Sequence, residues 1–127
     1  MAKLLVIDSE ESCCQLLAHV FSKQGHVVET VLSGEAAKNK IDGGDYDVII
    51  SEVRMPDVSG FELLEYARAA MSLAPFILMT AVPTERTAAL AVNRGAYGYV
   101  TKTEFLVEDL GSVVEKALKE QASRRVN

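Results

Sequence analysis

Short apolar runs alternate along the chain with longer segments in which apolar residues recur every three or four positions. The short runs favour β-strands, and several are apolar at consecutive positions, as is typical of strands buried on both faces. They predict five strands, at residues 3–7, 26–31, 48–51, 76–79 and 97–101. Strands that alternate with helical segments are typical of an α/β protein, in which a parallel sheet is covered by helices on both faces.

The helical segments begin and end at residues that favour helix termini. We expect the first helix to start near Ser9 and to stop before Gly25, and the second to begin after Ser33, whose hydroxyl can cap free amides. The third follows residues 59–60, the fourth follows residues 83–84, and the fifth ends near residue 121, ahead of a short charged tail. The 127 residues thus form five β-α units, which we expect to make a single domain over residues 1–127.

Composition and charge exclude several classes of protein. A formal net charge of -5 argues against direct nucleic-acid binding, which needs a concentrated basic surface. The apolar runs are too short to cross a bilayer, and the N-terminal residues lack the pattern of a signal peptide. We therefore expect a cytoplasmic protein with no membrane partner.

The cysteines and histidines carry little chemistry in this pattern. Cys13 and Cys14 are neighbours, and side chains of neighbouring helical residues point about 100° apart, so the two thiols do not converge on a metal. We expect both to be reduced thiols in the core or at its boundary. His19 and His26 have no acidic or cysteine partners at metal-ligand spacing and are expected to be surface residues.

Polar residues stand at the carboxyl ends of four predicted strands: Asp8, Glu52, Thr80 and Lys102. In an open parallel sheet ligands bind at this edge, so the four side chains are expected to converge. Asp8 and Glu52 could share Mg²⁺, which prefers oxygen ligands, while Lys102 balances the charge of a phosphoryl group. Thr80 could donate a hydrogen bond to a phosphoryl oxygen.

Any one of these residues alone is explained more simply, because buried strands commonly meet water at a polar residue. Four complementary groups on four strands favour a shared site that holds a phosphate beside a metal. The chain has no P-loop and no G-x-G-x-x-G motif, so nucleotide binding has no support.

Four segments form a recognisable combination: "LLVIDSE", "YDVIISEVRMPDVSGFELL", "ILMTA" and "GAYGYVTK". With them the chain resembles the receiver domain of bacterial two-component response regulators over essentially its whole length. The resemblance implies a flavodoxin-like sheet in the order 2-1-3-4-5, and an aspartate that receives a phosphoryl group with the help of magnesium. It also implies a regulatory signal-transduction domain rather than an enzyme.

The resemblance implies partners as well. A sensor histidine kinase or a phosphotransfer protein would deliver the phosphoryl group, in so far as the acceptor position still takes one. A downstream effector or output domain would read the surface made by the fourth helix, the fifth strand and the fifth helix, which such receivers also use to form homodimers.

Carried over residue by residue, the resemblance assigns a role to five positions. Asp8 is a metal-binding acid, and Arg54 offers a backbone carbonyl to the same metal. Thr80 is the switch hydroxyl and Tyr99 the switch aromatic. Lys102 is the lysine that contacts the phosphoryl group.

Two departures lie within the expected pocket. The phosphoacceptor position, three residues before Met55, holds Glu52 in place of aspartate. Ser9 stands where the family usually places another acid, which leaves Asp8, Glu52 and Lys102 with a formal charge of -1. We therefore expect weak magnesium binding, because affinity for hard cations falls as anionic ligands are removed. Ser9 is also expected to cap the first helix.

The third departure follows Lys102. Thr103 replaces the family's proline, and a cis bond before threonine would cost about 2.5–4 kcal/mol. We expect a trans bond, a reshaped loop and a capping box between Thr101 and Glu104 at the start of the fifth helix.

Glu52 leaves several hypotheses open. Its carboxylate reaches further than that of aspartate and could pair with Lys102 or accept from Thr80, as in a phosphorylation-independent receiver partly locked in an active-like state. Alternatively, a histidine kinase still phosphorylates Glu52, although a displaced nucleophile loses the advantage of in-line attack. Natural divergence and a deliberate locking substitution give the same sequence.

From a different class comes a small magnesium-dependent phosphatase with Asp8 as its nucleophile. Enzymes of the haloacid-dehalogenase type need an aspartate two residues further on, where this chain has Glu10, and no cap domain is apparent. The receiver reading is therefore preferred.

Overall fold

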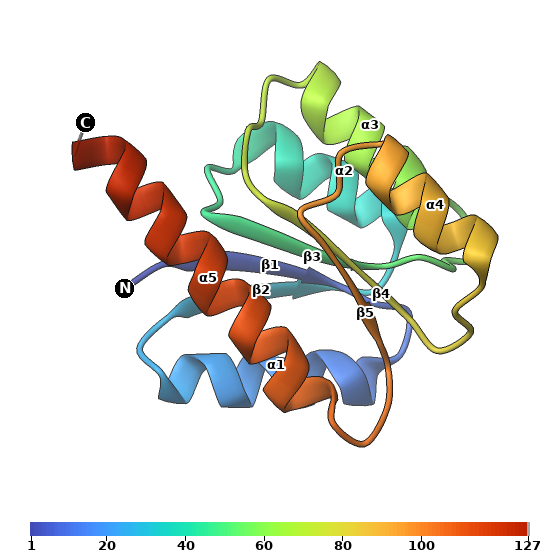
Figure 1. Ribbon diagram of the computed structural model, residues 1–127, viewed down its shortest axis with the longest axis horizontal. Coiled ribbons are helices and arrows are strands. Elements are labelled where there is room, and N and C mark those ends of the chain that lie inside the picture. The colour runs from blue at the N-terminus through green and yellow to red at the C-terminus, as the bar shows by residue number, and fades with distance from the viewer. Residues whose placement is uncertain (127) are drawn as a thin grey trace.

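The computed structural model describes residues 1–126, with side chains for residues 1–124. The chain forms a fully parallel five-stranded sheet in the order β2-β1-β3-β4-β5 (Figure 1). The strands are β1 (Lys3–Ile7), β2 (Val27–Val31), β3 (Val48–Glu52), β4 (Phe76–Thr80) and β5 (Gly98–Thr101). The strand order and the fold class agree with the prediction, and strand boundaries fall within one residue of those expected.

Helices cover both faces of the sheet. They are α1 (Glu11–Lys23), α2 (Gly34–Gly43), α3 (Gly60–Ala69), α4 (Glu85–Asn93) and α5 (Leu106–Val126). Helices α1 and α5 lie on one face, and α2, α3 and α4 lie on the other (Figure 1). The three-layer arrangement leaves the carboxyl ends of the strands as the free edge where a site can form.

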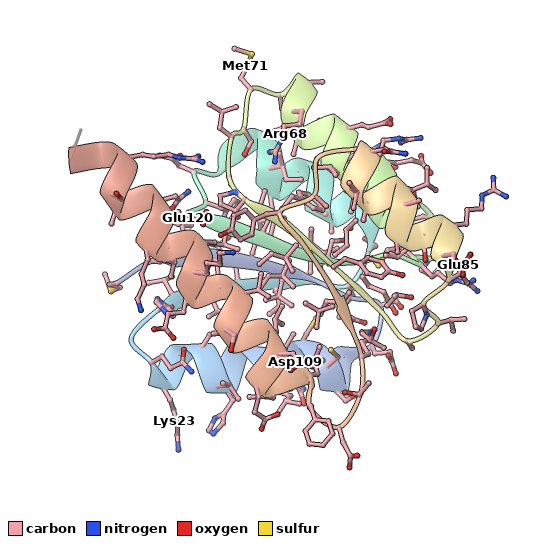
Figure 2. All side chains as sticks on the ribbon, in the orientation of Figure 1. Lys23, Arg68, Met71, Glu85, Asp109 and Glu120 are labelled. Carbon is pink, nitrogen blue, oxygen red and sulfur yellow. The ribbon has the colours of Figure 1, made fainter. Side chains whose placement is uncertain are left out.

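Successive strand residues alternate between two hydrophobic cores, because neighbouring side chains point to opposite faces of a sheet. In β1, Leu4 and Val6 pack in the core under α1 and α5, whereas Leu5 and Ile7 pack in the core under α2, α3 and α4. Side chains fill the space between the sheet and both helix layers (Figure 2). Burial on both faces explains why these strands read as continuous apolar runs.

Helix α5 continues to Val126, so the prediction that it ends near residue 121 is wrong. Its last turns consist largely of residues with good helix propensity, and two contacts hold them against the body of the protein. Tyr97 donates a hydrogen bond of 2.7 Å to Glu120, and the Gln121 amide donates to the Asp47 carbonyl at 3.0 Å. Tertiary contacts thus extend the helix beyond its last core residues.

The loop after β5 confirms one expectation and corrects another. The Lys102–Thr103 peptide is trans, as expected. The structure does not contain the expected capping box between Thr101 and Glu104 within the described residues. Instead, the Thr103 hydroxyl accepts from the Phe105 amide at 3.0 Å, so threonine closes this turn where it replaces proline.

The N-terminus of α3 packs directly against the end of β3. Ser59 and Glu62 form a capping box, and the Gly60 amide donates to the Val53 carbonyl at 2.8 Å. A Cβ atom at Gly60 would lie 2.5 Å from the Glu52 carbonyl oxygen. Only glycine therefore allows this helix to approach the strand end that carries Glu52.

The loop between β3 and α3 is also tied to helix α2. The Asp57 carboxylate accepts from the Gly34 and Glu35 amides, each at 3.0 Å. These hydrogen bonds from backbone amides hold the pKa of Asp57 below its ordinary value. Asp57 thus supports a helix N-terminus, where negative charge is favourable.

Within residues 1–126, no helix has the length and apolar character that crossing a membrane requires.

Gly60→Ala should lower the free energy of unfolding by about 1–3 kcal/mol, because the new methyl group overlaps the β3 backbone. Gly111→Ala in α5 is the matched control, since a Cβ there meets nothing within 4 Å. Loss of a mid-helix glycine should stabilise the protein by about 0.5–1 kcal/mol. Urea denaturation measures both, and equal effects of the two substitutions would contradict the packing described.

Asp57→Asn should lower the urea midpoint at pH 7, because the neutral amide is a weaker acceptor for the α2 amides. A carboxylate with a lowered folded pKa stabilises the protein above its ordinary pKa of 3.8, and this contribution is lost as the pH falls through the lowered value. The difference from the unaltered chain should therefore shrink below pH 3.8. The exposed Asp45→Asn should show no such difference, and a gap for Asp57→Asn that persists in acid would exclude this origin.

Candidate functional site

The side chain of Lys102 lies at the centre of a cluster of carboxylates at the carboxyl edge of the sheet. Its Nζ atom is 2.5 Å from Asp8 Oδ2, 3.1 Å from Glu52 Oε1 and 3.3 Å from Glu10 Oε1. Only 9% of the Lys102 side chain is exposed. We call Asp8, Glu10 and Glu52 the carboxylate cluster; the structure thus brings together three of the four strand-end residues predicted to converge and adds Glu10.

Backbone pairing fixes the lysine in this place. The Lys102 amide donates to the Thr80 carbonyl at 2.8 Å, directly beyond the register pair of Thr80 and Thr101. The side chain therefore leaves β5 beside the end of β4. From there it reaches across the edge of the sheet to the ends of β3 and β1, because parallel strands all end on the same side.

Both oxygens of the Glu52 carboxylate are occupied. Oε1 pairs with Lys102, while Oε2 accepts from the Ser9 amide at 3.2 Å and from the Ser9 hydroxyl at 2.9 Å. The prediction that Ser9 caps the first helix is wrong, because the helix begins after Glu10 and has no side-chain cap. Ser9 binds the longer carboxylate of Glu52 instead.

Glu10 is a site residue that the sequence analysis did not identify. It follows Ser9 directly, and residues just beyond a strand end often face a site, but its place in the chain equally suits the first turn of a helix. One oxygen from each member of the carboxylate cluster lies within 4.8 Å of the others. With Glu10 included, the formal charge of Lys102 and the carboxylate cluster is -2 rather than the expected -1.

Burial and ion pairing act in opposite directions on these groups. Burial raises the pKa of Asp8 above its ordinary value. Burial also raises the pKa of Glu52, but hydrogen bonds from Lys102 and Ser9 outweigh it, so the pKa is lowered overall. For Lys102, burial lowers the pKa, and the pairs with Asp8 and Glu52 more than compensate and raise it. The cluster is therefore held together by a charged lysine.

The carboxylate cluster fits a hard divalent cation. Asp8 Oδ2 is fully buried and accepts no hydrogen bond of suitable geometry, although it lies beside the Lys102 ammonium. Carboxylate oxygens are the ligands that Mg²⁺ prefers. The ammonium, however, lies among the same three oxygens that would bind the metal. Arg54 is exposed two residues beyond Glu52, and the role of its carbonyl as a metal ligand stays a prediction.

Thr80 is buried at the end of β4 but does not join the carboxylate cluster. Its hydroxyl accepts from the Val82 amide at 3.1 Å. Tyr99, on β5, lies half-buried, and its hydroxyl is 2.6 Å from the Thr87 hydroxyl on α4. Among the hydrogen bonds of the described side chains, none joins Thr80 to Tyr99 or to Glu52.

Cys13 and Cys14 are free thiols that lie close to the site. Cys14 is buried, and its Sγ atom lies within hydrogen-bonding range of the Asp8 carbonyl at 3.5 Å. Burial raises the pKa of Cys13 to about 12 and that of Cys14 to about 11. Both thiols are therefore protonated at neutral pH. Cys14 lies in the core and Cys13 packs against it, as expected of core or boundary thiols.

Comparisons with known proteins bear on this geometry. A family model described as the response regulator receiver domain matches residues 4–115. The chain is 36% identical over 102 residues to the transcriptional regulatory protein TcrA of Mycobacterium tuberculosis, a match that covers 79% of this chain and 40% of that protein. It is 30% identical over 123 residues to the regulatory protein AtoC of Escherichia coli, covering 97% of this chain and 26% of that protein.

Solved structures agree in fold. A two-component response regulator from Clostridium difficile superimposes with a TM-score of 0.88 at 27% identity, covering 95% of this chain and 98% of that one. The chemotaxis protein CheY4 of Vibrio cholerae gives a TM-score of 0.79 at 31% identity, covering 89% and 98%. The chain thus spans less than half of the two longer relatives but nearly all of these structures.

Lys102→Met should strengthen Mg²⁺ binding, because it removes a cation that is paired with all three carboxylates that could hold the metal. We expect an affinity gain of about tenfold, which corresponds to ~1.4 kcal/mol. Calorimetric titration with magnesium measures it. Lys119→Met removes a lysine paired with Glu115 on the exposed face of α5 and should leave the affinity unchanged. Equal affinities in Lys102→Met and the unaltered chain would show that the ammonium and the metal do not compete.

Proposed function

The chain belongs to the response regulator receiver domain family, and we propose that it is a receiver whose signalling state does not depend on phosphorylation. Receiver domains are regulatory domains of two-component systems rather than enzymes. Glu52 stands at the position that the resemblance assigns to the phosphoacceptor aspartate. The contacts of this glutamate indicate how such a receiver would work.

The observation that carries the proposal is the engagement of both Glu52 carboxylate oxygens. A carboxylate that attacks phosphorus must present a free oxygen in line with the leaving group. Here Oε1 is paired with Lys102, and Oε2 accepts two hydrogen bonds from Ser9. Attack through Oε2 would require the Ser9 hydrogen bonds to break, and pairing with Lys102 lowers the nucleophilicity of Oε1, which favours a carboxylate that holds the site together over one that reacts.

The same contacts support a partial imitation of the phosphorylated state. Glu52 supplies a negative charge to Lys102, as a phosphoryl group on aspartate would. The imitation is incomplete, because a carboxylate carries less charge and fewer oxygens than a phosphoryl group. In addition, Thr80 bonds to the Val82 amide rather than to Glu52. We therefore propose a receiver that is partly locked in an active-like state.

Phosphorylation of Glu52 by a histidine kinase is the second candidate, and the carboxylate cluster favours it. Asp8, Glu10 and Glu52 would hold Mg²⁺, which neutralises charge on phosphoryl oxygens when it is bound. Competition with Lys102 makes this binding weak. A phosphatase with Asp8 as nucleophile gains no support, since Asp8 is fully buried and paired with Lys102.

We also propose partners for this chain, because its family implies them. A sensor histidine kinase or phosphotransfer protein would dock near the carboxylate cluster, and an output domain or effector would read the surface of α4, β5 and α5. Val92 on α4 is 78% exposed, so this surface offers an apolar contact to an effector or to a second copy of the chain. We place the protein in the cytoplasm, where two-component receivers meet their kinases.

Intact-mass measurement after incubation with acetyl phosphate and Mg²⁺ tests the proposal. The unaltered chain should gain no phosphoryl group, whereas Glu52→Asp should gain one, because the shorter carboxylate is released from Ser9 and regains the position of the family's acceptor. Glu52→Gln is the control that removes the charged acceptor but keeps the length of the side chain. Labelling of the unaltered chain at Glu52 would refute the proposal and establish the second candidate.

A further inference from the structure

The hydroxyl of Thr87 forms hydrogen bonds with Thr84, the N-cap of α4, and with Tyr99 of β5. It accepts from the Thr84 amide at 3.1 Å, as one half of the capping box that begins α4, and lies 3.1 Å from the Thr84 carbonyl, to which it donates. It also lies 2.6 Å from the Tyr99 hydroxyl. Either hydroxyl can be the donor in this pair, and the Thr87 hydroxyl also lies 3.0 Å from the Thr84 hydroxyl.

Tyr99 is therefore held by helix α4. Its side chain packs against the core under α2, α3 and α4, a core that includes Ala91 of the same helix. Within the sheet, Tyr99 is the register partner of Leu78 on β4. Strand β4 in turn pairs with β3, which ends at Glu52 of the carboxylate cluster. A short hydrogen bond at the tip and core packing along the ring together fix the orientation of the tyrosine.

Thr80 has no part in this arrangement. It is 2% exposed, and its hydroxyl accepts from the Val82 amide in the loop that leads to α4. Within the side chains that the structure describes, its hydroxyl makes no hydrogen bond to Tyr99. The Tyr99 hydroxyl is thus hydrogen-bonded to the first turn of α4 and not to the residue that the resemblance assigns as the switch hydroxyl.

We infer that Thr87 is the positioning residue for Tyr99, and that it holds this tyrosine in place whatever the state of the carboxylate cluster. This role deepens the proposed function. A signalling role of Thr87 rests on that function, since Tyr99 belongs to the surface of α4, β5 and α5. A receiver whose tyrosine is fixed from the helix side keeps one output surface without phosphorylation. Thr87, rather than Thr80, then controls that surface.

The test uses the chain labelled with 3-fluorotyrosine and ¹⁹F NMR. The four tyrosines give four resonances, and Tyr99→Phe identifies that of Tyr99. Thr87→Val keeps the shape of the side chain but removes its hydroxyl, so the Tyr99 resonance should shift or broaden while the other three stay in place. Thr87→Ser restores a hydroxyl and should restore the resonance.

Two further variants distinguish the effect of the Thr87–Tyr99 contact from the effects of Thr84 and Thr80. Thr84→Ala removes the other half of the capping box and a hydroxyl that lies 3.0 Å from that of Thr87, but it keeps the Thr87 hydroxyl beside Tyr99, so the Tyr99 resonance should shift less than in Thr87→Val. Thr80→Val should leave it in place. A Tyr99 resonance that responds to Thr80→Val but not to Thr87→Val would overturn the inference, as would failure of Thr87→Ser to restore it.

A reciprocal measurement serves if Thr87→Val does not fold. Tyr99→Phe keeps the ring but removes the hydroxyl that is hydrogen-bonded to Thr87, so amide hydrogens in the first turn of α4 should exchange severalfold faster. Unchanged exchange there would overturn the inference. Phosphorylation of Glu52, in contrast, would refute the proposed function and leave the effects of Thr87→Val as stated, so the two failures are distinguishable.

Discussion

The ion pairs of the Lys102 ammonium with three carboxylates determine the character of the site. Charges are costly to bury unless they are paired and hydrogen-bonded, and removal of one partner leaves the others uncompensated. The fold supplies the pairing, because a parallel sheet ends β1, β3 and β5 at one edge and so brings their acids and their lysine together. Helix α3 can approach this edge only because Gly60 has no side chain.

Glu52 changes the chemistry at the carboxyl edge of the sheet without changing the fold. A longer side chain carries its carboxylate to Lys102 on one side and to Ser9 on the other, so each departure from the family pattern satisfies the other. A second acid at position 9 would repel this carboxylate, whereas a serine donates to it. Glu10 restores the missing negative charge from the next position, which leaves the cluster with its acidic character and Lys102 with three partners.

The fold could be predicted from the sequence because strand periodicity and helix termini are local signals. Side chains of β1 alternate between two cores as its apolar run indicates, and the strand-end acids and lysine meet as the topology requires.

The partners of Ser9, Glu10 and Thr87 could not be predicted in the same way. A serine after a strand and a threonine in a first helical turn both suit capping, and only the three-dimensional distances to Glu52 and Tyr99 show their tertiary contacts. For α5, contacts of Glu120 and Gln121 with distant residues extend a helix whose apolar stripe ends earlier.

Phosphorylation-independence is tested most directly at the output surface itself. Backbone amide NMR spectra of the unaltered chain and of Glu52→Asp would be compared before and after addition of Mg²⁺ and beryllofluoride, a phosphoryl analogue that binds aspartate. The resonances of α4, β5 and the start of α5 should stay unchanged in the unaltered chain and should shift in the aspartate variant. Matching shifts in the unaltered chain would show that its output surface still responds to a phosphoryl group, which would contradict a site that Glu52 and Lys102 hold closed.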